Sequence, residues 1–141
     1  MIIKFDNLSE SEFLEKFLNM VNMLSSPEKN IATAEAQLLI EFLLLPEEKF
    51  KYQRFSSLAK AKVIQSAASK NWNLTKINVN NKIYSLIDKG FLRRDTDGVI
   101  YIAKYILAAL ASYRANKTFE IKITFNDKEY TPPTSGNSKG N

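Results

Sequence analysis

The chain has 141 residues, of which 45% are hydrophobic and 25% are charged, a composition typical of one globular domain with short extensions. It contains no cysteine and no histidine, which excludes disulfides, thiolate metal sites and both Ser-His-Asp and Cys-His catalysis. No nucleophile–base pair can be assembled from the remaining residues. We therefore expect a non-enzymatic protein without catalytic residues, metal ligands or cofactors.

The net charge of +5 is distributed unevenly along the chain. Residues 1–48 carry three basic and nine acidic residues, whereas residues 49–94 carry eleven basic residues and a single acid, Asp88. A basic block of this kind is typical of a surface that binds a polyanion. The alternative is a solvated lysine-rich surface in a protein from an A+T-rich source, because lysine and asparagine have A-rich codons. A low-GC bacterium or its phage would be such a source.

The first part of the chain predicts a strand and an amphipathic helix. Residues 2–5 favour a short strand, and Ser9 is a helix cap followed by apolar residues at helical spacing up to Leu24. We assign residues 1–30 as an N-terminal extension. The longest apolar stretch, residues 38–45, is too short to span a membrane, and the start has no signal-peptide pattern. We expect a cytoplasmic protein with no membrane partner.

The middle of the chain predicts a helical unit followed by a hairpin. Apolar periodicity places three helices over residues 33–45, 56–70 and 75–89. Thr33 and Thr75 are the expected N-caps, Gly90 ends the last helix, and residues 46–55 form a basic loop. Two β-prone runs within residues 91–102, joined by a turn that ends in Asp-Gly, predict a tight hairpin.

The remaining chain predicts a helix, a strand and a tail. Residues 103–115 form a helix with little polar face, and residues 118–125 alternate as a half-buried strand does. This strand pairs with residues 2–5 or extends the sheet of a partner. Helix and strand belong to a C-terminal unit of residues 104–130, and residues 131–141 form a flexible tail.

The two outer helices, over residues 9–25 and 103–115, carry more apolar surface than a small domain needs. We expect a homodimer, or docking onto a larger assembly, through these helices.

The order of helix, helix, turn, helix, glycine and hairpin resembles the winged helix-turn-helix family of DNA-binding domains. The most telling stretch is residues 83–102, in which Leu86-Ile-Asp-Lys-Gly-Phe-Leu-Arg-Arg94 leads into the hairpin. The resemblance covers residues 31–103, and the loop over residues 46–55 and the helix over residues 56–70 are longer than in the most compact members. It implies a mainly α fold with a small β-hairpin, flanked by N- and C-terminal helices. The implied function is a regulator of transcription or replication that binds double-stranded DNA.

The resemblance also implies which residues contact DNA. The helix over residues 75–89 would enter the major groove. With Val79 at the centre of its buried stripe, the polar side chains expected on the far side are Asn78, Asn81, Lys82, Ser85 and Lys89. Asparagine can pair with adenine, and lysine reaches guanine or phosphate. The hairpin would bring Arg93 and Arg94 to the minor groove or the backbone. The preceding helix would contact phosphates through Lys60, Lys62 and Lys70.

The tip of the expected hairpin favours an alternative. Asp95 and Asp97 lie there and would repel phosphate. A structural or adaptor protein, such as a phage virion or assembly component, could use the same scaffold for protein contacts alone.

Overall fold

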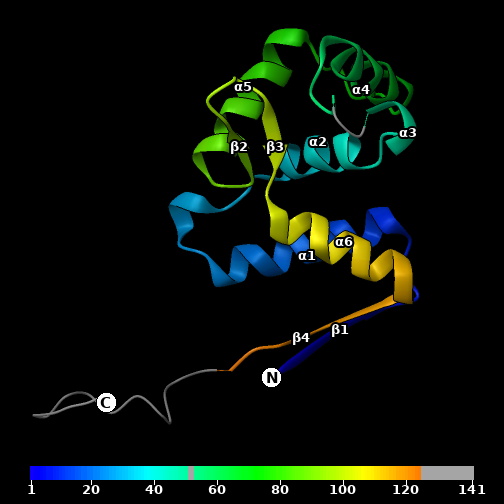
Figure 1. Ribbon diagram of the computed structural model, residues 1–141, viewed down its shortest axis with the longest axis vertical. Coiled ribbons are helices and arrows are strands. Elements are labelled where there is room, and N and C mark those ends of the chain that lie inside the picture. Colours follow the sequence, from blue (N-terminus) through cyan, green and yellow to red (C-terminus); the bar gives the residue numbers. More distant parts are fainter. Residues whose placement is uncertain (51–52, 125–141) are drawn as a thin grey trace, which may run out of the picture.

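The computed structural model describes residues 1–50 and 53–124, and helices account for most of them. The elements in chain order are β1 (Ile2–Asp6), α1 (Glu10–Leu24), the 3-10 turn η1 (Pro27–Lys29), α2 (Thr33–Leu43), α3 (Glu47–Phe50), α4 (Ser57–Ser69), α5 (Lys76–Asp88), β2 (Leu92–Arg94), β3 (Ile100–Ile102), α6 (Lys104–Asn116) and β4 (Thr118–Lys122). Figure 1 shows α2 to α5 and the β2–β3 hairpin as an upper group, with α1, α6 and the β1–β4 ribbon below it. The predicted mainly α architecture with a small hairpin is confirmed, and a second two-stranded sheet accompanies it.

The helices begin where side chains satisfy the free amides of the first turn. Ser9 and Glu12 form a reciprocal capping box at α1, with N–O distances of 3.1 and 2.9 Å. Thr75 caps α5 by accepting from the amide of Asn78, as predicted. The prediction of Thr33 as the N-cap of α2 is wrong, because Thr33 is itself the first residue of the helix and the N-cap is the residue before it. Its N-cap is Ala32, whose amide donates to the carboxylate of Glu35.

The segment after α2 is more ordered than the predicted loop. The carbonyl of Pro46 accepts from the amides of Lys49 and Phe50, and the four residues of α3 form one helical turn. Phe50 is 2% exposed and explains the turn, because burying this ring requires the chain to fold back onto the core. Local helical periodicity cannot signal such a short element.

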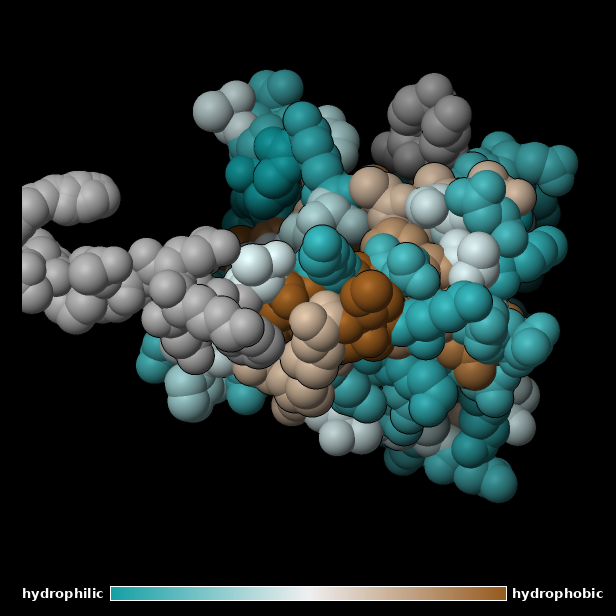
Figure 2. Space-filling model, turned by 90° about the horizontal axis from the view of Figure 1, so that it is seen from below, coloured by the Kyte–Doolittle hydropathy of each residue, from teal (hydrophilic) through white to brown (hydrophobic). Residues whose placement is uncertain are grey.

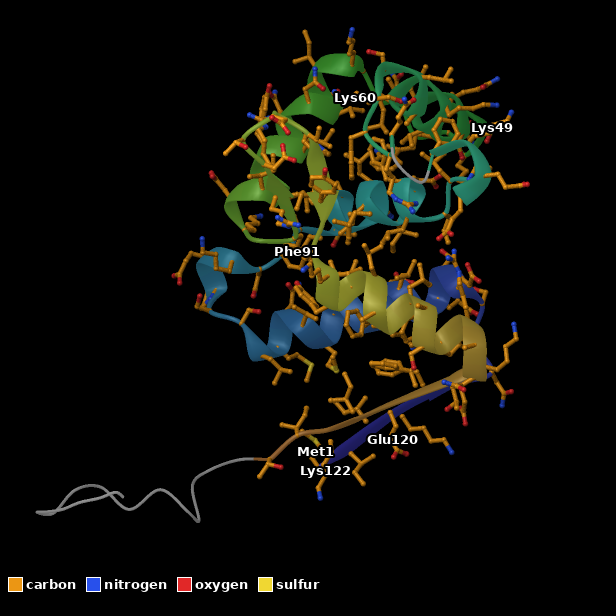
Figure 3. The ribbon with its side chains drawn as sticks, in the orientation of Figure 1. Met1, Lys49, Lys60, Phe91, Glu120 and Lys122 are labelled. Atoms are coloured by element: carbon orange, nitrogen blue, oxygen red, sulfur yellow. The ribbon has the colours of Figure 1, made fainter. Side chains whose placement is uncertain are left out.

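α2 lies at the centre of the fold. Leu38, Leu39 and Phe42 are completely buried, and α2 contacts α1, α4 and α5. This agrees with the sequence of α2, which places apolar residues on almost every side of the helix. One hydrophobic core extends from the upper group into the lower one. Phe91, at the start of the hairpin, is 2% exposed and lies where the two groups meet (Figure 3).

The lower group joins the two ends of the described chain. β1 and β4 pair antiparallel, which is the first of the two alternatives predicted for this strand, and Phe5 lies opposite Phe119. Both rings contact Phe13 on α1 edge-on, at centroid distances of 5.5 and 5.6 Å. β4 ends at Lys122, before the predicted end of the strand at residue 125. Residue 125 and the predicted tail over residues 131–141 lie outside the described residues.

Most of the apolar surface that suggested a partner for the outer helices is covered within the chain. α1 and α6 pack against each other, and Phe13 stacks on Tyr113 at 4.3 Å. The large apolar residues that stay exposed on these helices are Met23, Leu24, Tyr105 and Leu107. Seen from below, Figure 2 shows apolar side chains near the middle of this face, with many hydrophilic side chains beside them. A homodimer stays a prediction, and the surface left for it is smaller than the two helices imply.

Tyr113 ties α6 to the start of α1, and its removal should be measurable. Its hydroxyl donates to the carbonyl of Leu8 at 2.6 Å and accepts from the amide of Leu8 at 2.8 Å. We expect Tyr113→Phe to lower the free energy of unfolding by about 1–2 kcal/mol, because two hydrogen bonds are lost while the ring packing remains. Urea unfolding followed by circular dichroism measures this. Tyr105→Phe, at a tyrosine that is 45% exposed, should change stability by less than about 0.5 kcal/mol.

Among the described residues, no helix has the length and the apolar character needed to cross a membrane.

Candidate nucleic-acid interface

α5 is held on three sides, and this decides which residues it presents to solvent. Val79, Ile83 and Leu86 are buried in the core. On one flank, Lys60 of α4 donates to the side chain of Asn80 at 2.9 Å. On the other flank, α5 meets α2. The free side of the helix lies between these flanks, opposite Val79.

Two of the predicted DNA-contacting residues face α2. Lys89 donates to Glu35 at 2.6 Å, and the hydroxyl of Ser85 donates to the second carboxylate oxygen of Glu35. Glu35 is only 8% exposed. The placement of Ser85 and Lys89 on a free face is therefore wrong. The helical wheel assumed one buried direction, whereas α5 also has a neighbour on this flank.

The carboxylate of Glu35 is stabilised in its charged form. Burial alone would raise the pKa of Glu35, but hydrogen bonds from Lys89, Ser85 and the amide of Ala32 outweigh it. The pKa therefore lies below its ordinary value of 4.5. This ionised group fixes the hidden flank of α5 to α2.

The residues that project furthest from α5 differ in part from the predicted set. Ile77 is 72% exposed and Tyr84 is 55% exposed, and both share the free face with Asn81. Asn78 is also exposed, and its side-chain oxygen accepts from the hydroxyl of Thr75 at the helix start. Lys82 is half-buried, on the flank of α5 that also carries Ser85 and Lys89. Ile77 and Tyr84 were missed because an apolar residue on a helix is normally assigned to the core.

The hairpin joins this face through an arginine. The guanidinium of Arg94 on β2 lies 5.4 Å from the ring centre of Tyr84 on α5. Arg93 lies over Tyr101, its partner across the hairpin, at 5.2 Å. Both arginines are exposed. We call the group Lys76, Ile77, Asn78, Asn81, Lys82, Tyr84, Arg93 and Arg94 the α5–hairpin surface.

One of the two acids at the hairpin tip helps to hold the turn. One carboxylate oxygen of Asp95 accepts from the amides of Asp97 and Val99, each at 2.9 Å. Gly98 completes the turn with a φ of +83°, a conformation that favours glycine. The negative charge of Asp95 also raises the pKa of Tyr101 above its ordinary value. Asp95 therefore has a structural role in the turn, and Asp97 is the exposed acid.

The lysines of α4 divide between the two ends of the helix. Lys62 is exposed, and Lys60 lies beside α5 near the upper end of the molecule (Figure 3). Lys70 forms an ion pair with Glu41 of α2, which also accepts from Ser66. The structure therefore groups Lys60 with α5 and directs Lys70 toward α2.

The acidic first third of the chain neutralises part of the basic block. Glu35 and Glu41 pair with Lys89 and Lys70. Arg54 lies 3.9 Å from Glu47 and donates to the last carbonyls of α2, at 3.3 Å. The basic residues that α4, α5 and the hairpin leave outside these pairs are Lys60, Lys62, Lys76, Lys82, Arg93 and Arg94. Lys51 lies outside the described residues.

Comparison with protein-family models, with curated proteins and with solved structures found no match for this chain. Among the described residues, no group of three or more acidic side chains is placed to hold a metal ion.

Proposed function

We propose that the protein is a winged-helix DNA-binding protein that places α5 in the major groove of double-stranded DNA. The observation that carries this proposal is the contact between Arg94 and Tyr84. It brings the exposed face of α5 and the basic hairpin side by side, and in the proposed complex both would face the same duplex. The order of α2, α4, α5 and the β2–β3 hairpin supports the winged-helix assignment. Its biological role would be the regulation of transcription or replication.

The start of α5 has the chemistry that base recognition requires. In helix-turn-helix proteins, residues near the N-terminus of the recognition helix contact base edges. Asn81 offers an amide that can bond an adenine edge at two points, and Ile77 offers methyl groups that can contact a thymine methyl. Lys76 and the positive end of the helix dipole favour a nearby phosphate.

The hairpin and α4 supply contacts that position the protein without reading sequence. Arg93, Arg94 and Lys62 are exposed cations with enough reach for the phosphates beside the groove. The hydrogen bonds of Asp95 within its own turn give this acid a structural role, although its negative charge remains at the hairpin tip. Ser85, Lys89 and Lys70 are left out of the proposed interface, since each serves an acidic partner on α2.

Asn81→Ala should reduce sequence discrimination with little loss of general affinity. The amide makes no hydrogen bond to another described residue, so its removal leaves the fold intact. We expect the preference for a duplex selected from a random pool, over a scrambled duplex, to fall by about 1–3 kcal/mol. Competition binding at one fixed salt concentration measures this. Asn19→Ala, at an exposed position on α1, is the matched control, and an equal effect of both variants would contradict the proposal.

A second candidate function is an adaptor that uses the same scaffold to bind another protein. The specific observation in its favour is the exposure of apolar side chains on α4 and α5, where Leu58 is 63% and Ile77 is 72% exposed. A partner protein that co-purifies with this protein, that is lost with Ile77→Ser and whose binding is insensitive to salt would favour this candidate. Salt-dependent binding to duplex DNA would favour the first.

A further inference from the structure

A groove on the side of the hairpin combines an apolar floor with a basic rim. It has a volume of about 610 Å³ and lies between β3 and α6, with the end of α2 and residue Phe55 beneath it. Val99, Leu107, Leu110 and Ala111 line it together with Phe55. The volume falls within the range of small-molecule sites, and an apolar lining with a few polar groups is typical of them.

The charges at this groove are mostly positive. Arg54, Arg93, Lys104 and Arg114 border it, against the single acid Glu47. Arg54 is held by α2 and Glu47, and Arg114 is held by Glu10 and Glu47, at 2.9 and 3.2 Å. These two cations are therefore largely occupied by the fold.

The other two cations have no such partner. Among the described residues, no carboxylate lies within 4.0 Å of the charged nitrogens of Arg93 or Lys104. Arg93 comes from β2 and lies over Tyr101, and Lys104 is the first residue of α6. The rim thus offers positive charge from two elements directly beside an apolar floor.

We propose that this groove binds a small amphiphilic anion, whose aliphatic chain lies on the apolar floor and whose carboxylate or phosphate contacts Arg93 and Lys104. A simple inorganic anion would leave the floor unused, and a neutral lipid would leave the rim cations uncompensated. Burial of the ligand's aliphatic chain removes apolar surface from water, and its head group gains charge-assisted hydrogen bonds from the rim cations. This groove is lined by no residue of α5, although it shares Arg93 with the α5–hairpin surface, and its test does not require DNA binding.

The test is titration of the full chain with sodium decanoate, followed by calorimetry and by amide chemical shifts. We expect saturable binding at one site with a Kd below about 1 mM, as befits a ligand of this size. The shifts should concentrate on β3 and α6. Decanol should bind at least about ten-fold more weakly, because it cannot use the rim charges.

Variants separate the floor from the rim. Ala111→Phe, which fills the groove, and Lys104→Gln, which removes a rim charge, should each weaken decanoate binding by about ten-fold or more. Lys16→Gln, which removes an exposed charge on α1 outside the groove, should leave decanoate binding unchanged. Thermal unfolding by circular dichroism shows that each variant is folded, and Lys104→Gln tests the proposal even where Ala111→Phe is unstable.

Three results would overturn the proposal. The first is equal binding of decanoate and decanol, and the second is a set of chemical-shift changes that lie away from β3 and α6. The third is a dimer that light scattering detects without ligand and that Ala111→Phe converts to a monomer. Each leaves the DNA-binding proposal standing, because that proposal rests on the contact between Arg94 and Tyr84 and is tested by duplex titrations.

Discussion

The double variant Lys82→Ala/Arg94→Ala is expected to bind duplex DNA of any sequence roughly 100-fold more weakly than the unmodified protein at low salt. Both side chains belong to the α5–hairpin surface, and each removed phosphate contact weakens binding without regard to sequence. The slope of log K against log salt concentration should become shallower by about 2, since two fewer counterions are released. Fluorescence anisotropy with a labelled random duplex at several salt concentrations measures both quantities.

The chain offers a matched control for this experiment. Lys4 and Lys122 are exposed on the β1–β4 ribbon, and Figure 3 shows Lys122 at the end of the molecule opposite Lys60. Lys4→Ala/Lys122→Ala removes the same charge from the far side and should leave the salt slope unchanged. If both double variants lose affinity equally, DNA is attracted by net charge alone and the proposed surface is wrong.

Glu35→Gln should lower the free energy of unfolding at pH 7 by about 2 kcal/mol. Lys89 and Ser85 would lose their charged acceptor in a nearly buried place, although Lys89, at 21% exposure, can regain some hydration. Urea unfolding at a series of pH values measures the difference. Glu15→Gln, at an exposed position on α1, should cost less than about 0.5 kcal/mol.

The stabilisation that Glu35 contributes to the fold should depend on pH. The pKa of Glu35 is lower in the folded protein than its ordinary value of 4.5. Its ionised form therefore stabilises the fold fully above the unfolded pKa, and this stabilisation is lost as the pH falls through the folded pKa. The difference between Glu35→Gln and the unmodified protein should narrow as the pH is lowered below 4.5. A difference that stays constant with pH would show that the packing of Glu35 matters and its charge does not.

Local chemistry made much of the fold predictable. Ser9 and Thr75 are caps whose side chains satisfy free amides within three residues, so the helix starts could be located from sequence. Gly90 follows α5 with a φ of +87°, and the alternation in β4 identified a half-buried strand. The turn at α3 was missed because the burial of Phe50 depends on the tertiary fold.

The candidate site was predictable only in part. Asn78 and Asn81 were placed correctly on the exposed side of α5 because helical geometry fixes their angle to Val79. Ser85 and Lys89 were misplaced because their direction depends on Glu35, which lies 50 and 54 residues away in the chain. The contact between Tyr84 and Arg94 also depends on how the hairpin folds back onto the helix, and nothing in the local sequence specifies that.

The ribbon in the lower group has a consequence for how the molecule assembles. The backbone of Met1 exchanges hydrogen bonds with that of Ile123, so the ribbon closes a loop that contains almost the whole described chain. The upper group depends instead on contacts among residues that all lie within the stretch 33–102, so the loops that its contacts close are shorter. Long loops cost more entropy to close than short ones, so the central helices should nucleate folding and the ribbon should join last. During synthesis, the segment before α1 would wait without its strand partner until the ribosome has passed β4.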